Sequence, residues 1–91
     1  MIEVKSFNLD AIAYIPIYSP RHAYKVEIVN AAAVLMRLRS NPTDSTTEIE
    51  MLPGQAKTFT STKNTAIYDP AQVLFHAILA SGTGVVKVIA H

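Results

Sequence analysis

Polar and apolar residues alternate along much of the chain, and short clusters of turn-forming residues separate the alternating segments. In residues 24–29, Val26 and Ile28 fall on one face of an extended chain and charged residues on the other, which is typical of a strand with one buried side. Residues 85–90 form a similar apolar run after the glycine-containing turn 81–84. This pattern predicts antiparallel strands connected by tight turns.

Turn chemistry predicts a further pair of strands in the middle of the chain. Leu52-Pro53-Gly54-Gln55 fits a type II turn, because proline fixes φ at the second position and glycine supplies a positive φ at the third. Residues 48–52 and 56–60 flank this turn, and we expect them to be strands that form a hairpin. The polar segments 41–47 and 61–64 are predicted to be surface loops.

Pro16 lies in a segment, residues 12–18, that is rich in β-branched and aromatic residues and is predicted to be a strand. Because a proline cannot donate a hydrogen bond to a neighbouring strand, this strand is expected at the edge of a sheet. Tyr14 and Tyr18 flank Pro16, and aromatic side chains provide a large contact area at low entropic cost. We therefore predict that Tyr14, Pro16 and Tyr18 belong to an interface with another chain.

Residues 31–39 and 71–80 fit either a helix or a strand. In the first segment, Asn30 is a suitable helix cap before an alanine-rich stretch, yet the residues that follow alternate with period two. In the second segment, Asp69 and Pro70 are a suitable helix start, yet the run is apolar on nearly every side and leads into the final strand. We interpret both segments as strands, the second forming a hairpin with the last strand.

Short strands at this spacing predict an all-β fold in one domain, residues 1–91. We expect a single-domain antiparallel β-sandwich or a jelly-roll-like fold, in which residues 1–23 are an N-terminal arm or edge-strand segment.

The composition favours contact with other chains. Hydrophobic residues make up 49% of the chain and charged residues 16%, whereas a charged fraction of about 25% is usual. A domain of this size hides only about 60–65% of its unfolded surface, so part of the apolar surface is expected to meet another chain. The net charge of +1 arises without any run of like charges, which argues against nucleic acid as the main partner.

The chain contains no cysteine, so disulfides and thiolate metal sites are excluded, and packing or oligomerisation must stabilise the small core. No apolar stretch resembles a signal peptide or a membrane span. We expect synthesis in a cytoplasm and no membrane partner.

Residues with catalytic or metal-binding chemistry show no productive spacing. His22, His76 and His91 lie far apart, and no glycine-flanked serine elbow accompanies them. The pair Gly82 and Gly84 precedes a strand, whereas a phosphate-binding loop would precede a helix. We therefore predict a protein that is not an enzyme and has no catalytic, cofactor-binding or metal-binding residues.

Arg37 and Arg39 share one face of their predicted strand, and Glu48 and Glu50 share one face of theirs. If the two strands are neighbours, the charges can pair across the sheet and form a solvated face. The alternative is that Arg37 and Arg39 contact an acidic surface of a partner protein.

Four segments together resemble small virion proteins of tailed bacteriophages, the head-decoration or cement proteins with a β-sandwich fold. The resemblance covers about the last two thirds of the chain and rests on a strand ending in asparagine and on two glycine-containing turns, in the segments Val26-Glu27-Ile28-Val29-Asn30, Leu38-Arg39, Leu52-Pro53-Gly54-Gln55 and Ala80-Ser81-Gly82-Thr83-Gly84-Val85-Val86-Lys87-Val88. No functional residue is transferred by it, because such proteins act through their surfaces.

The resemblance implies a capsid accessory protein, made in the host cytoplasm and located on the capsid surface of the virion. Its partners would be the major capsid protein and further copies of itself, with a homotrimer as the favoured assembly. Two other functions are compatible with the sequence: another virion component, such as a tail, fibre or head-completion protein, and a sugar-binding β-sandwich module in which exposed tyrosines stack on sugar rings.

Overall fold

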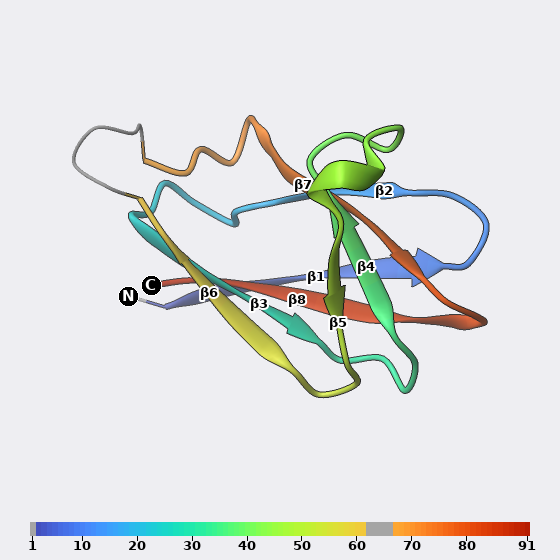
Figure 1. Ribbon diagram of the computed structural model, residues 1–91. Coiled ribbons are helices and arrows are strands. Elements are labelled where there is room, and N and C mark those ends of the chain that lie inside the picture. The colour runs from blue at the N-terminus through green and yellow to red at the C-terminus, as the bar shows by residue number, and fades with distance from the viewer. Residues whose placement is uncertain (1, 62–66) are drawn as a thin grey trace.

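The computed structural model describes residues 2–61 and 67–91 and shows two antiparallel four-stranded sheets packed face to face (Figure 1). The order in the first sheet is β1 (Glu3–Asp10), β8 (Thr83–Ala90), β3 (Lys25–Asn30) and β6 (Ala56–Thr60). In the second sheet it is β2 (Ile15–Tyr18), β7 (Val73–Leu79), β4 (Met36–Arg39) and β5 (Ile49–Met51). Every connection except β4–β5 passes from one sheet to the other, which gives the strand order of a jelly roll.

The core lies between the two sheets and is formed by alternate residues of each strand. Val26 and Ile28 of β3 are completely buried, as their alternation with charged neighbours predicts. Met36 and Leu38 face them from β4 of the second sheet and are equally buried. Full burial of such side chains stabilises the fold by about 1.5–3 kcal/mol each. The inter-sheet core is thus the main source of stability in a chain without cysteine.

Asn30 is a completely buried polar residue at the end of β3. Its side-chain Nδ2 donates to the carbonyl oxygens of Val34 at 2.9 Å and Met51 at 3.0 Å, and its Oδ1 accepts from the backbone N–H of Ala32 at 3.0 Å. Because Met51 belongs to β5, this single amide connects the two sheets and also closes the loop that follows β3.

The predicted type II turn is confirmed, but the predicted hairpin around it is wrong. Gly54 has φ of +80°, and the N–H of Gln55 donates to the carbonyl of Leu52 at 3.0 Å. However, β5 pairs with β4 and β6 pairs with β3, so the turn joins the two sheets. The backbone of Asn30 explains this placement, because its carbonyl accepts from Gly54 N–H at 2.8 Å and its N–H donates to the Gln55 carbonyl at 3.0 Å.

The second predicted hairpin is wrong for a similar reason. Residues 73–79 are a strand, as expected, but β7 pairs with β2 and β4 while β8 pairs with β1 and β3. The turn between them is bound by the loop that precedes β4, because Ala80 N–H donates to the carbonyl of Leu35 at 2.9 Å. Asp69 starts a turn instead of a helix, and its carboxylate accepts the N–H of Ala71 at 2.8 Å.

The segment 31–39 is a strand only over its last four residues. Residues 31–35 form a loop whose start is bound to the buried Asn30 side chain, and this local hydrogen bonding replaces both the expected strand and its helical alternative. Residues 45–47 of the predicted loop 41–47 form a short 3₁₀ helix, η1 (Ser45–Thr47).

The N-terminal residues form edge strands in this fold and not a free arm. β1 lies at the edge of the first sheet and β2, which contains Pro16, lies at the edge of the second. Residues 62–64 of the predicted loop 61–64 lie outside the described part of the chain.

Candidate protein-binding surface

Four of the five predicted interface residues come together on the outer face of the second sheet. In the strand register, Pro16 of β2 lies opposite His76 of β7, and His76 lies opposite Arg39 of β4. Arg37 is two residues away on the same face of β4. The guanidinium carbon of Arg39 lies 5.0 Å from the ring centroid of Tyr14, which brings Tyr14 to the same place.

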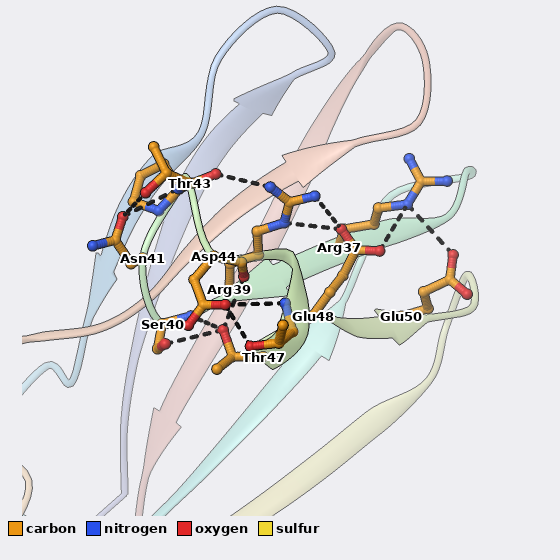
Figure 2. A network of polar contacts seen from close by, with 11 residues as sticks. Arg37, Arg39, Ser40, Asn41, Thr43, Asp44, Thr47, Glu48 and Glu50 are labelled. Atoms are coloured by element: carbon orange, nitrogen blue, oxygen red, sulfur yellow. Dashed lines mark hydrogen bonds and ion pairs between the residues drawn. The ribbon is translucent and has the colours of Figure 1, made fainter.

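Charge pairing between β4 and β5 neutralises this face within the chain (Figure 2). Glu48 Oε1 accepts from Arg39 Nε at 3.0 Å and lies 2.8 Å from Arg39 Nη2. Arg37 Nε lies 3.4 Å from Glu50 Oε2 and 3.9 Å from Glu48 Oε2. β4 and β5 are therefore neighbours that pair their charges, and an acidic partner would have to displace carboxylates that both arginines already contact.

The loop between β4 and β5 holds these charges in a fixed position. Arg39 Nη1 donates to the carbonyl of Pro42 at 2.8 Å, and the hydroxyls of Ser40 and Thr47 hydrogen-bond to each other at 3.0 Å (Figure 2). Asp44 caps η1 and accepts hydrogen bonds from the hydroxyl and the N–H of Thr46. These bonds favour the carboxylate and lower the pKa of Asp44 below its usual value.

Tyr18 is separated from the other predicted interface residues. The register between β2 and β7 shifts between Ile17 and Tyr18, which marks a β-bulge or irregularity. The ring of Tyr18 contacts the ring of Phe7 in β1, with 6.2 Å between the centroids, so it joins the two sheets at their edge. Tyr18 thus packs between the two sheets here, and its place in an interface stays a prediction.

Two of the three histidines lie near carboxylates. His22 is 3.6 Å from Asp69 and His91 is 3.7 Å from Glu27. His76 Nδ1 is buried without a hydrogen-bond partner among the described residues. Over the same residues, no group of three or more histidine, aspartate or glutamate side chains is placed to hold a metal ion.

The sequence did not reveal a second surface, which we call the uncharged end. It consists of the four connections 11–14, 31–35, 52–55 and 80–82, which contain no charged residue. They meet because β1, β3, β5 and β7 end where β2, β4, β6 and β8 begin (Figure 1).

The uncharged end also carries strongly exposed apolar side chains. Ile12 is 89% exposed and Leu52 is 63% exposed. Asp10 lies just before the first connection, and its carboxylate accepts the N–H groups of Ile12 at 2.9 Å and Ala13 at 3.1 Å, which lowers the pKa of Asp10. Each connection taken alone is an ordinary turn, so only the strand order reveals the surface.

No model of a known protein family matches the chain, and no curated protein or solved structure matches it significantly. In the described part of the chain, no helix has the length and apolar character needed to cross a membrane.

Proposed function

We propose that the protein is a non-enzymatic structural component of a virion that decorates and stabilises the capsid of a tailed bacteriophage. It binds the major capsid protein and assembles with further copies of itself. The observation that carries this proposal is the uncharged end, where four connections contain no charge and the two at opposite edges of the sandwich expose Ile12 and Leu52.

Exposed apolar residues on connections without charged residues favour protein binding, and the carboxylate of Asp10, which accepts the N–H groups of Ile12 and Ala13, borders them. Covering Ile12 and Leu52 would contribute about 1.5–3 kcal/mol for each side chain, and no ionic group of these connections would lose its hydration. Such a surface fits an apolar, uncharged area on a partner protein.

The connections are also ordered before binding, which reduces the entropic cost of association. Ala31 N–H donates to the carbonyl of Val85 at 3.0 Å, and Ala80 N–H donates to that of Leu35 at 2.9 Å. In the first connection, the side-chain carboxylate of Asp10 accepts the N–H groups of Ile12 and Ala13. The exposed apolar side chains therefore project from a fixed base.

The fold supports the proposal only at the level of architecture. Jelly rolls form capsid domains and also lectin domains, so the strand order alone leaves the function open. The resemblance of the turn segments to phage decoration proteins favours the capsid.

Co-sedimentation with expanded heads of the source phage tests the proposal. The unaltered protein should pellet with heads, and Ile12→Glu or Leu52→Glu should weaken binding by about tenfold or more, because a buried carboxylate would lack a partner. Tyr24→Glu is the matched control, since Tyr24 is 69% exposed and lies directly before β3, away from the uncharged end. Absence of binding to heads, or equal binding by all variants, would overturn the proposal.

A further inference from the structure

The outer edge of β1 offers unpaired backbone groups. β1 is the first strand of its sheet and pairs with β8 only, among the strands that the structure describes. Val85 and His91 hydrogen-bond toward β3, because Val85 O accepts from Ala31 N and His91 N donates to Lys25 O, both at 3.0 Å. In an antiparallel ladder alternate residues bond to opposite sides, so the even-numbered residues of β8 bond to β1.

This alternation determines which groups of β1 face the open edge. The even-numbered residues of β8 lie opposite Glu3, Lys5, Phe7 and Leu9 in the register. Val4, Ser6 and Asn8 therefore direct their N–H and C=O groups away from β8.

The first half of β1 has no proline to block its exposed edge, and its charged residues, which often discourage pairing at an edge, carry opposite signs. Ile2 is 62% exposed and Val4 is 54% exposed, and residues 2–6 contain no proline. Glu3 and Lys5 are also exposed, and the ammonium group of Lys5 lies 5.4 Å from the ring centroid of Phe7.

We propose that β1 pairs with β1 of a second copy of this chain, antiparallel and about a two-fold axis at Val4. In this register Val4 faces Val4 of the second copy, and each Glu3 faces a Lys5. The two chains thus form two opposite-charge cross-strand pairs on one face of a continuous sheet, while Ile2 and Val4 lie on its other face.

Charge selects this register among the symmetric alternatives. Moving the axis to Lys5 places two lysines opposite each other, and moving it to Glu3 places two glutamates opposite each other, which is destabilising. An axis at Ser6 leaves Glu3 and Lys5 without opposite charges, because it places them against Leu9 and Phe7. Only the axis at Val4 pairs every charge of this half-strand, and the occupant of the edge is therefore a second copy.

Charge reversal gives a direct test, with sedimentation velocity of the full chain as the readout. Glu3→Lys and Lys5→Glu each create two like-charge pairs and should weaken self-association by about tenfold to one hundredfold. The two variants mixed in equal amounts should associate again, because each lysine of one then faces a glutamate of the other. The double variant, with both charges exchanged, should associate like the unaltered protein.

Two controls keep the test decisive. Lys87→Glu changes the net charge as Lys5→Glu does, but Lys87 is an exposed residue of the interior strand β8, so association should be unchanged. Circular dichroism checks that each variant is folded. A monomer at all concentrations, a trimer that is insensitive to Glu3 and Lys5, or no recovery on mixing would overturn the proposal. The inference deepens the proposed self-association and needs no capsid, so its failure leaves the proposed binding to heads to the separate co-sedimentation test.

Discussion

Replacing Asn30 with alanine should strongly destabilise the fold. The side chain is completely buried and forms three hydrogen bonds, with the carbonyls of Val34 and Met51 and the N–H of Ala32. Alanine leaves all three partners in the interior without the amide.

The loss can be worked out from these three bonds. Each contributes about 0.5–1.5 kcal/mol net, so Asn30→Ala should reduce the free energy of unfolding by about 2–4 kcal/mol. The whole domain is expected to be stable by about 5–14 kcal/mol. A loss of about 3 kcal/mol corresponds to a decrease in Tm of about 12–24 °C.

Asn30→Asp keeps the size of the side chain and changes its hydrogen-bonding groups, so it tests the hydrogen bonds alone. A carboxylate cannot donate to the two carbonyls, whereas a protonated carboxyl can donate to one of them, so the pKa of the introduced group should be raised in the folded state. Its stabilising contribution is present below the unfolded pKa of about 3.9 and is lost as the pH rises through the raised folded value. This variant should be more stable near pH 4 than at neutral pH.

Urea denaturation followed by far-ultraviolet circular dichroism measures these effects. Asn41→Ala is the control, because Asn41 accepts hydrogen bonds only within its own exposed loop, and its loss should be within about 1 kcal/mol. A loss below about 1 kcal/mol for Asn30→Ala, or an Asn30→Asp variant without this pH dependence, would refute the role given to the amide.

Three further experiments test other parts of the structure. Gly84→Ala should destabilise by about 1–3 kcal/mol in thermal denaturation, because its Cβ would lie 2.5 Å from Ala32 Cβ, and an unchanged Tm would contradict this close approach. Double-mutant cycles should give a coupling of about 1 kcal/mol for the better buried pair Arg39–Glu48 and below about 0.5 kcal/mol for Arg37–Glu50, whose side chains are 38% and 57% exposed. Because the pKa of Asp10 is lowered in the folded state, its contribution is present above the unfolded value of about 3.9 and is lost as the pH falls through the folded value. Asp10→Asn should therefore flatten the acid limb of a Tm–pH curve, and an unchanged limb would argue against the bonds to Ile12 and Ala13.

Local patterns were sufficient to predict most of the strands and several of their faces, although β1 was expected only as part of an arm or edge-strand segment and residues 31–35 were expected to be a strand. Alternation correctly predicted the buried Val26 and Ile28, and the missing donor of Pro16 correctly predicted an edge strand. Both features depend on residues close in sequence, so they can be recognised without the fold.

Sheet membership depends on contacts between distant residues and could not be predicted in this way. The turns at Gly54 and Gly82 reverse the chain, but turn chemistry does not indicate whether the flanking strands pair with each other. The backbone of Asn30 binds the first turn, and its side chain reaches Met51 of the second sheet, which no local pattern reveals. The uncharged end was missed for the same reason, because strand order alone brings its four connections together.

The orientation of the protein on phage heads tests the central claim most directly. High-resolution imaging of expanded heads incubated with the protein should show the jelly roll with Ile12 and Leu52 facing the shell. Heads without added density, or density in which the uncharged end points away from the shell, would contradict the account.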